Sequence, residues 1–404
     1  MSLLSLSYCA LVVFSVALCL VLPQRSRPAV LCLCSLLFYA WGSLAHACLV
    51  VCCGLVVFGI GELLFAKRNR WLFALGIGLC VGLLCFYKYS VLFLSTLGDL
   101  FPSGVASTFL THRADSLAAS IHIPLGISFF TFEFVHYLTD VYKRNITRPH
   151  PLPTLGKRML DFLLFFLFFP TLLAGPIKRY QAFSPDLLTN RQEQLAQGLW
   201  RILLGLLKKV LIADSLAVFA SRLGTPELVT AKGLWFAMYA YAGQIYADFS
   251  GYSDVAIGVS LLLGYRIPEN FQWPYLATSL SEFWRRWHIS LSSWIRDYLF
   301  IPLGGSHVPR VRAVFNLLLV MGLCGLWHGP AGHFVVWGLW QGVGLGIEHR
   351  ARKRRTPATR KISGLRSLLG WFWTFHFVCF GWILFAAPSL KAALCAIQRM
   401  FGGS

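Results

Sequence analysis

The stretch ACLVVCCGLVVFGIGELLFA, residues 47–66, is twenty residues long and holds a single charged side chain, Glu62. A helix needs about 20 mostly apolar residues to cross the hydrocarbon core of a membrane. This stretch therefore has the length and composition of a transmembrane helix. It predicts that the fold is built from membrane-spanning helices.

Similar stretches recur along the chain, and the composition agrees with them. The 404 residues are 57% hydrophobic and 13% charged, whereas about a quarter of the residues of an average soluble domain are charged. Counting the weaker segments, we predict about 9–11 spans. The apolar stretch nearest the N-terminus, residues 6–22, lacks a preceding basic region and a small-residue cleavage site, so we expect a retained helix and not a signal peptide. The clearest further stretches are residues 6–22, 29–45, 72–97 and 368–387.

Two apolar segments, residues 160–176 and 315–330, contain proline and look too short or too interrupted to cross as plain helices. Irregular backbone at membrane depth is tolerated where protein encloses it or where it lines a cavity. We therefore expect re-entrant or broken helices at these places.

Basic residues outnumber acidic ones by 36 to 16, a formal net charge of +20. They cluster beside the apolar stretches, which indicates membrane topology and excludes a nucleic-acid partner. The positive-inside rule makes these clusters cytoplasmic, so the N-terminus and the region 99–120 lie on the outside. The clusters are Arg25 and Arg27; Lys67, Arg68 and Arg70; Lys143, Arg144, Lys157 and Arg158; Lys208 and Lys209; and residues 350–361.

The twelve cysteines are scattered through apolar segments without the spacing of a metal site, so we expect small packing residues. The sequence contains no polar domain and no repeat. We predict one membrane domain over residues 1–404, with N-terminal helices in 1–121, a catalytic core in 122–349, and a basic cytoplasmic loop and last helix in 350–404.

Residues 279–300 predict a charged, aromatic helix. Ser279 and Glu282 have the spacing of a capping box at its start, and Gly304 and Gly305 follow its end. Helical spacing places aromatic residues and a histidine on one face and basic and hydroxyl residues on others. This composition also suits an interfacial helix with arginines at the surface, in which the histidine is structural. The aromatic face is Trp284, Trp287, His288, Leu291 and Ile295; Arg285, Ser292, Ser293 and Arg296 lie elsewhere.

The second candidate histidine is His328, in Trp327-His-Gly-Pro330. A helix that begins near Arg310 and Arg312 would reach about 20 Å into a core about 30 Å thick before this break. An imidazole at membrane depth is costly, and ionisable groups there are functional by default, although a packed, hydrogen-bonded histidine remains an alternative. A neutral imidazole can take a proton from a hydroxyl that attacks a carbonyl, so acyl transfer is the chemistry it favours.

Further polar side chains occur in apolar surroundings in QIYADFSGYSD (244–254) and at Asn270. They could line a cavity or orient the histidines, or they could only satisfy one another between helices. His376 stands alone in an apolar run, and we expect a structural role for it. The residues in question are Gln244, Asp248, Ser250, Ser253, Asp254 and Asn270.

Several stretches together resemble the membrane-bound O-acyltransferase family, in particular the bacterial branch typified by the membrane subunit of alginate O-acetylation. The resemblance covers about two thirds of the chain and does not depend on one short motif. It rests on PLGISFFTFE (124–133), AGP (174–176), KKVLIAD (208–214), DFSGYSDVAIG (248–258), residues 282–305 and GLWHG (325–329).

The resemblance implies a ring of helices around a central funnel, in which a cytoplasmic acyl donor meets an acceptor from the far side. It implies that His328 is the catalytic histidine and that His288, after FWRRW, is the second functional one. It also implies acetyl-CoA as donor without a bound cofactor, and O-acetylation of an extracellular alginate, cellulose or peptidoglycan. The expected partners are lipid, a polysaccharide synthesis and export complex, and a periplasmic acetyltransferase with a serine nucleophile. The expected location is the bacterial inner membrane.

Some positions depart from the family pattern. Thr171 and Gln341 stand where histidine is common, and Ala386 stands where arginine is common. Gly305 is followed by Ser306-His307 and not by Asn-Arg. These changes leave both central histidines in place, but they bear on the acceptor and the partner surface.

The sequence therefore predicts an acetyltransferase in which His328 is the general base and His288 helps to position the donor. An acetyl-histidine intermediate is a variant of this mechanism. D-alanyl transfer from a carrier protein, transfer to a lipid, and a conduit without chemistry are the alternatives. The predicted substrate-binding residues are Trp284, Arg285, Trp287, Arg296, Asp297, Trp327, Gln244, Asp248 and Asn270, and no metal site is expected.

Overall fold

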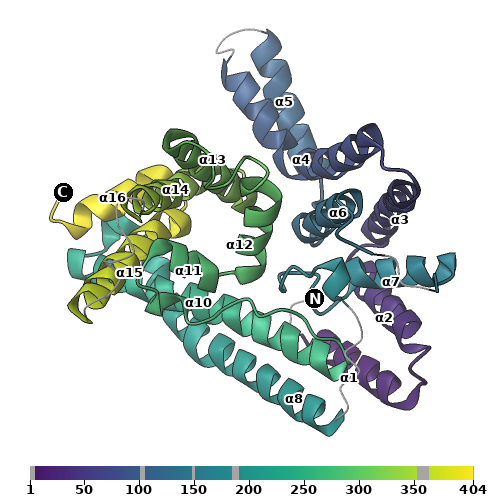
Figure 1. Cartoon of the computed structure of the whole chain (residues 1–404). Coiled ribbons are helices and arrows are strands. Elements are labelled where there is room, and N and C mark those ends of the chain that lie inside the picture. The colour runs from purple at the N-terminus through teal and green to yellow at the C-terminus, as the bar shows by residue number, and fades with distance from the viewer. Residues whose placement is uncertain (1–4, 101–104, 148–150, 184–190, 353–363, 404) are drawn as a thin grey trace. The chain divides into compact units, whose positions relative to one another are not determined.

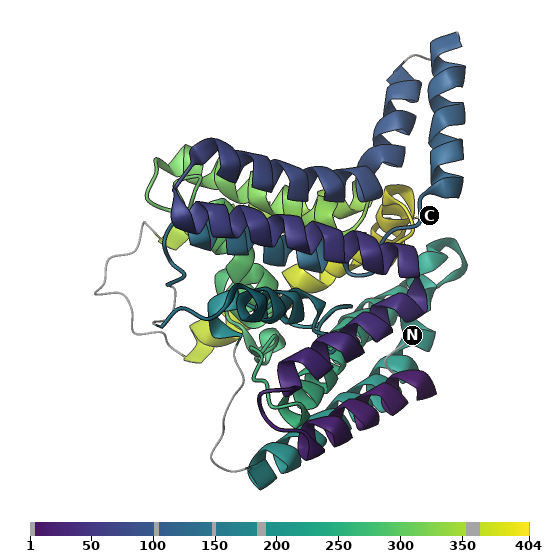
Figure 2. The ribbon, with the colours of Figure 1, turned by 90° about the vertical axis from the view of Figure 1, so that its right-hand side faces the viewer.

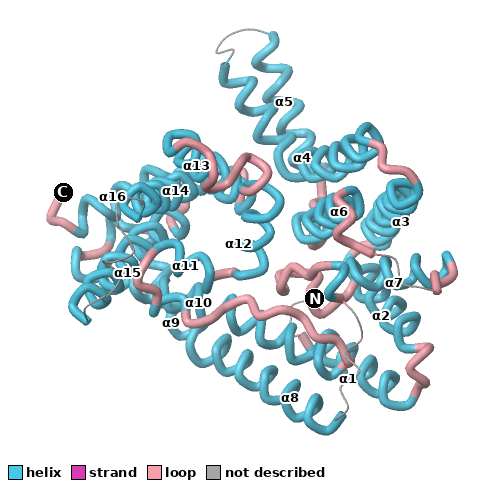
Figure 3. Tube along the Cα trace, viewed as in Figure 1, coloured by secondary structure: helices cyan, strands magenta, loops and turns pink. Residues whose placement is uncertain are grey.

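The computed structural model describes residues 5–100, 105–147, 151–183, 191–352 and 364–403. Helices are the only regular elements in this part of the chain, and it contains no strand (Figures 1 and 3). The chain divides into two compact units: unit 1 is Met1–Gly198 with Val259–Ile267, and unit 2 is Leu199–Gly258 with Pro268–Ser404. The predicted all-helical fold is confirmed. Most of the basic run 350–361 lies outside the described residues.

Among the described residues, four helices are long and apolar enough to cross a membrane. They are α3 (Leu44–Ala66), α4 (Arg70–Leu100), α13 (Arg310–His328) and α15 (Gly364–Ala386). Two shorter apolar helices, α1 (Leu6–Val21) and α2 (Arg27–Gly42), match further predicted stretches. The prediction that 315–330 is too broken to cross as a plain helix is wrong, because α13 is continuous over 19 residues. The helix continues to His328 because its residues are apolar and favour helix, and it ends before Gly329 and Pro330.

Unit 2 contains most of the helices that follow residue 198. The chain passes from α8 (Arg191–Leu207) through a π-helical segment (Lys208–Ala213) into α9 (Asp214–Ala220) and then α10 (Ala231–Leu262). The remaining helices are α11 (Leu280–Arg286), α12 (Ile289–Ile295) with a π-helical end (Arg296–Phe300), α13, α14 (Gly332–Arg352), α15 and α16 (Leu390–Met400). Short 3₁₀ turns at Ser221–Gly224, Pro226–Leu228 and Pro274–Leu276 connect them.

The helices α13 and α14 form a tight hairpin in unit 2 (Figure 1). Glycines make this close approach possible: a Cβ at Gly325 would overlap the carbonyl oxygen of Phe334, and a Cβ at Gly338 would overlap that of Met321. Small residues at a helix contact let two backbones come together, as is common in membranes. The hairpin brings the end of α13, with His328, beside the start of α14.

Unit 1 is built from α1 to α7. The helices α2 and α3 pack against α7 (Leu155–Leu167), and α3 and α4 pack against α6 (Ile127–Tyr142). The end of α4 and the helix α5 (Val105–Ser120) form a hairpin that extends away from the rest of this unit (Figures 1 and 2). The described parts of the region 99–120, which we expected to lie outside the membrane, belong to the end of α4 and to α5.

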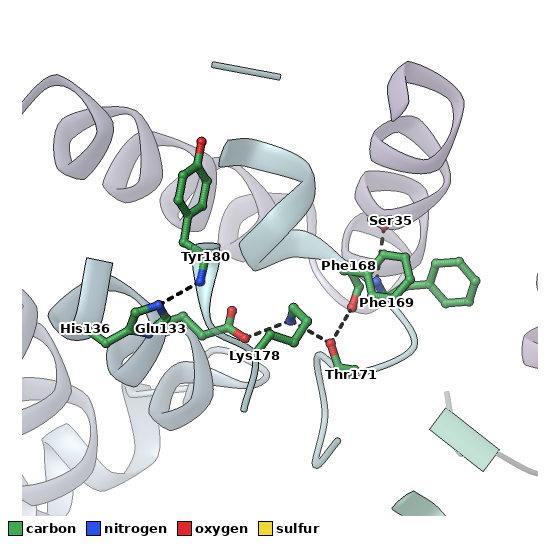
Figure 4. Close-up of polar contacts among 8 residues, drawn as sticks. All are labelled: Ser35, Glu133, His136, Phe168, Phe169, Thr171, Lys178 and Tyr180. Carbon is green, nitrogen blue, oxygen red and sulfur yellow. Dashed lines mark hydrogen bonds and ion pairs between the residues drawn. The ribbon is translucent and has the colours of Figure 1, made fainter. Parts of the chain in front are cut away.

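After α7, residues 168–180 of unit 1 leave the helix, as the proline-containing sequence predicts. Buried side chains satisfy part of this irregular backbone (Figure 4). The amide of Phe169 donates to Ser35 Oγ at 3.2 Å, and the amide of Tyr180 donates to His136 Nε2 at 3.1 Å. Gly126, with a φ of +70°, lies so close to the carbonyl oxygen of Leu172 that a Cβ would be 2.5 Å from it.

A buried ion pair holds the same segment to α6. Lys178 Nζ lies 2.7 Å from Glu133 Oε1 and donates to Thr171 Oγ1 at 2.7 Å (Figure 4). Thr171 in turn donates to the carbonyl oxygen of Phe168 at 3.2 Å. All three polar residues are at most 4% exposed. Thr171, one of the departures from the family pattern, thus accepts a hydrogen bond from a buried ammonium group.

We predict that Lys178→Met lowers the free energy of unfolding by about 3–5 kcal/mol, because it leaves the Glu133 carboxylate buried without its cation. The double variant Lys178→Met/Glu133→Leu should recover most of this loss. Lys157→Met, which breaks the exposed pair with Asp161, is the matched control and should cost about 0–1 kcal/mol. Unfolding in detergent measures all three, and a single Lys178 variant as stable as the control contradicts the prediction.

Candidate active site

The predicted helix over 279–300 is broken in the middle. It begins as expected, with Ser279 Oγ accepting from the amide of Glu282 at 3.3 Å. The helix α11 then ends at Arg286, and His288 has a φ of +42° before α12 begins. The single aromatic face predicted from helical spacing is therefore wrong. A left-handed backbone at a residue other than glycine is uncommon and occurs often at functional sites.

The side chain of Asn270 holds this break in place. Its Oδ1 accepts from the amide of Ser290 at 3.3 Å and from Ser290 Oγ at 2.9 Å, and it lies 3.1 Å from His288 Nδ1. Its Nδ2 donates to Ser253 Oγ on α10 at 3.2 Å. Asn270 is fully buried, and the backbone amide of Ile289 donates to its carbonyl oxygen at 2.9 Å. Of the possibilities that the sequence left open for Asn270, the structure shows a contact with a histidine, His288.

This arrangement fixes the tautomer of neutral His288. The amide of Ser290 can only donate, so the atom of Asn270 that it contacts is the oxygen and not the nitrogen. The ring nitrogen Nδ1 must then carry the proton and donate to that oxygen. The lone pair of the neutral ring is therefore on Nε2.

Aromatic rings surround the His288 imidazole, which is 2% exposed. Its ring centroid lies 4.7 Å from that of Phe249, 6.5 Å from that of Phe271 and 6.5 Å from that of Trp327. Trp287, the preceding residue, is also buried and packs its ring against Trp382 at 4.9 Å. The rings that contact this histidine are thus apolar, and its polar contact is with Asn270.

His328 is the last residue of α13, where the sequence predicts the helix to end. Its imidazole is half-buried, with ring centroids of Trp327, Trp337 and Phe385 at 4.6, 5.2 and 5.0 Å. The Trp327 ring contacts both candidate histidines, with its centroid 6.5 Å from that of His288 and 4.6 Å from that of His328. The structure therefore brings together two histidines that are forty residues apart in the chain.

Trp284 and Trp337 continue the aromatic wall beside His328. Their ring centroids are 6.0 Å apart, and Trp337 stacks on Trp382 at 5.8 Å. Trp284 was predicted from the sequence, whereas Trp337, Trp382 and Phe385 were missed. Trp337 lies in an ordinary apolar stretch, and only its position three residues before the conspicuous Trp340-Gln341 pair could have drawn attention to it.

Two other predicted polar residues, Asp248 and Asp254, form ion pairs with basic residues. Asp248 pairs with Lys209 Nζ at 2.8 Å, and Lys209 also binds Asp214. Asp254 pairs with Arg201 and Lys208, both at 2.6 Å. These ion pairs join α8 and its π-helical end to α10, which favours the alternative that these groups satisfy one another. Gln244 is half-buried on α10.

The arginines of the broken helix differ in exposure and in their ion-pair partners. Arg285 is exposed, whereas Arg286 pairs with Glu282 at 2.6 Å. Arg296 is exposed and pairs with its neighbour Asp297 at 2.7 Å in the π-helical segment. Gly304 and Gly305 then turn the chain with φ values of +102° and +57°.

The remaining candidates have structural partners. His376 contacts the hydroxyl of Tyr239 at 3.0 Å and the carbonyl oxygen of Phe372 at 2.8 Å, in keeping with the structural role expected for it. All twelve cysteines lie in helices and are free. Within the described residues, no group of three or more histidine, cysteine or acidic side chains could hold a metal ion.

Comparisons with known proteins agree with this chemistry. The model of the membrane-bound O-acyltransferase family matches residues 84–387. The protein named "Probable alginate O-acetylase AlgI" from Pseudomonas aeruginosa is 37% identical over 94% of this chain and 70% of its own length. A "Peptidoglycan O-acetyltransferase" from Helicobacter pylori is 35% identical over 92% of this chain and 73% of its own length. A "Teichoic acid D-alanyltransferase" from Bacillus subtilis is 32% identical over 65% of this chain and 68% of its own length.

The family match covers both candidate histidines and their aromatic surroundings. Of the four described helices that are long and apolar enough to cross a membrane, it includes all of α13 and α15 and the second half of α4. The resemblance inferred from the sequence is confirmed. The chain is a multi-pass membrane O-acyltransferase and belongs to the membrane-bound O-acyltransferase family.

Proposed function

We propose that this enzyme takes acetyl from acetyl-CoA at the cytoplasmic face of a bacterial inner membrane for the O-acetylation of an extracellular polysaccharide. The observation that carries the proposal is the meeting of His288 and His328 in one aromatic frame within unit 2. The relatives named for acetylating alginate and peptidoglycan, similar over more than nine tenths of this chain, support the acetyl group and a glycan acceptor.

In the proposed mechanism, His328 is the general base. Its imidazole takes the proton of an acceptor hydroxyl as that oxygen attacks the carbonyl carbon of the thioester. With both substrates bound, the surrounding rings would limit access of water and so protect the acyl group from hydrolysis. His288, with its lone pair on Nε2, orients the donor or the acceptor by accepting a hydrogen bond. Two-step transfer through an acetyl-histidine is the variant of this mechanism.

The wider assembly belongs to the same proposal. We expect a single membrane domain with a central funnel, the N-terminus on the periplasmic side, and no bound cofactor. The acceptor would be reached through a periplasmic partner with a serine nucleophile and a polysaccharide synthesis and export complex. Trp284, Trp287 and Trp327 would enclose the donor, while Arg285, Arg296, Asp297, Gln244 and Asp248 would act farther from the histidines.

D-alanyl transfer is the second candidate, and the 32% identity to a teichoic acid D-alanyltransferase favours it over transfer to a lipid and over a conduit without chemistry. Acetyl transfer and D-alanyl transfer differ in the donor, which is a small coenzyme in one case and a carrier protein in the other. Supplying each labelled donor separately to the same proteoliposomes therefore separates them.

We predict that His328→Ala reduces transfer of labelled acetyl from acetyl-CoA by at least about 100-fold, because the general base is lost. Transfer to alginate and peptidoglycan fragments is measured in proteoliposomes, with hydrolysis as a second readout. His376→Ala, at a histidine with structural partners, is the matched control and should keep its activity. Equal transfer rates in wild type and His328→Ala would contradict the mechanism and favour a conduit without chemistry.

A second prediction concerns Asn270 as a positioning residue for His288. Asn270→Leu should lower the free energy of unfolding by about 2–4 kcal/mol and reduce kcat, because four side-chain hydrogen bonds are lost. Asn270→Asp keeps an acceptor for Ser290 and His288 and should recover part of kcat.

The control for this prediction is Ser253→Ala, which removes a partner of Asn270 without touching its bond to His288. It should cost about 1 kcal/mol of stability and leave kcat unchanged. If kcat falls in proportion to stability in both Ser253→Ala and Asn270→Leu, Asn270 has a structural role alone and the positioning role is rejected.

A further inference from the structure

One face of α14 carries buried polar atoms that the described residues leave without a hydrogen bond. Gln341 is 1% exposed, and neither Nε2 nor Oε1 of its side chain has a partner among the described residues. Trp337, four residues earlier and also 1% exposed, has no partner for its indole Nε1 within the same part of the chain. Residues four apart share a helix face, so both groups lie on one side of α14.

The Trp337 end of this face lies beside the candidate active site, and Gln341 lies one helical turn farther along α14. The Trp337 ring is 5.2 Å from the imidazole of His328. Trp284, whose ring is 6.0 Å from that of Trp337, likewise has a buried indole Nε1 without a partner among the described residues. The Gln341 amide lies against α15 at Gly381, where a Cβ would come within 2.7 Å of Nε2.

Leaving such groups unsatisfied in an apolar interior is unfavourable, so most buried polar groups in proteins have a partner. The neighbouring indoles follow this rule: Trp340 Nε1 donates to the carbonyl oxygen of Phe377 at 3.0 Å, and Trp382 Nε1 donates to Tyr275 at 3.1 Å. Buried polar atoms without a partner also occur elsewhere among the described residues, for example at Ser15 and Thr131. Those of Trp284 and Trp337 differ in that they belong to the rings beside His328, where a ligand with matching polar groups could complete them.

We propose that Trp337 and Gln341 bind the acyl donor, with Trp337 donating its indole N–H to the thioester carbonyl oxygen and Gln341 pairing with an amide of the pantetheine arm. This inference rests on the proposed function. Gln341 offers one donor group and one acceptor, which match the carbonyl and N–H of an amide. Trp337 and Gln341 are separated by about one helical turn, which rises about 5.4 Å along α14. The thioester carbonyl and the first amide of the pantetheine arm are separated by a comparable distance.

Trp337 then acts on the developing charge of the reaction. The acceptor oxygen bonds to the carbonyl carbon, the carbon–sulfur bond breaks, and the hydroxyl proton passes to His328 and on to the leaving thiolate. Negative charge rises on the carbonyl oxygen in the transition state. An N–H that donates to this oxygen in a dry site stabilises the transition state more than the ground state.

The test uses substitutions that delete the polar atoms; Gln341→Met also keeps the volume, whereas Trp337→Phe keeps an aromatic ring but is smaller. Trp337→Phe should lower kcat about 100-fold with little change in KM for acetyl-CoA. Gln341→Met should raise KM for acetyl-CoA, and the Kd of an S-acetonyl-CoA thioether analogue, about tenfold. The melting temperature of Gln341→Met should be unchanged or higher, because it loses a polar group that the empty protein leaves unsatisfied. Trp337→Phe should lower it, because the smaller ring leaves a cavity, so its effect on kcat is compared with that of Trp340→Phe.

Two controls delete polar groups that already have partners in the protein. Trp340→Phe, on the same helix, removes the N–H that donates to Phe377 and should leave kcat and KM unchanged. Asn316→Leu removes the amide that donates to the carbonyl oxygen of Leu303 at 3.0 Å and should lower the melting temperature.

The outcomes separate this inference from the function on which it rests. If wild type transfers acetyl and both variants keep full kcat, KM and analogue binding, the polar atoms are satisfied by water alone and the inference is wrong. If wild type transfers no acetyl and does not bind the analogue, the proposed function itself fails. Lower kcat in Trp337→Phe together with weaker analogue binding in Gln341→Met supports both.

Discussion

The structure depends on one constraint: an apolar interior offers no water to polar groups, so each buried donor or acceptor needs a partner within the protein. In unit 1 this constraint explains how the irregular segment after α7 persists, because Ser35, His136 and the Lys178–Glu133 pair satisfy its backbone and side chains. In unit 2 it explains the strained backbone at His288. The left-handed conformation is held by Asn270, which accepts from two residues of the break and donates to α10.

The same constraint separates supporting residues from reactive ones. Asp248 and Asp254 have cationic partners and hold helices together. His288 is fixed on one nitrogen and keeps a lone pair on the other. Next to His328, the indole N–H of Trp337 lacks a partner among the described residues, and so does the amide of Gln341 one turn farther along α14. Under the proposed function, a polar group left open beside the general base is where a substrate would bind, since preorganised donors there need not rearrange during the reaction.

Much of the fold could be predicted from sequence because hydrophobic length is a strong signal in membranes. The stretch 6–22 is α1, Leu6–Val21, and the stretch 72–97 lies within α4, Arg70–Leu100. The capping residue Ser279 was also predictable, because its spacing to Glu282 is local. The break at His288 was not, because Trp-Arg-Arg-Trp-His-Ile-Ser contains no glycine or proline and the left-handed turn is imposed by Asn270, eighteen residues away. The partner of Asp248 and the place of Trp337 beside His328 depend on helix packing that periodicity does not encode.

The central claim is that acyl transfer takes place at His328, inside the frame of tryptophans in unit 2. An experimental structure with bound S-acetonyl-CoA, in which a methylene group makes the thioester analogue stable, tests this claim most directly. The account predicts that the ketone carbon lies in contact with the His328 imidazole and that the ketone oxygen lies within hydrogen-bond distance of Trp337 Nε1. An analogue bound with its ketone away from both residues would contradict it.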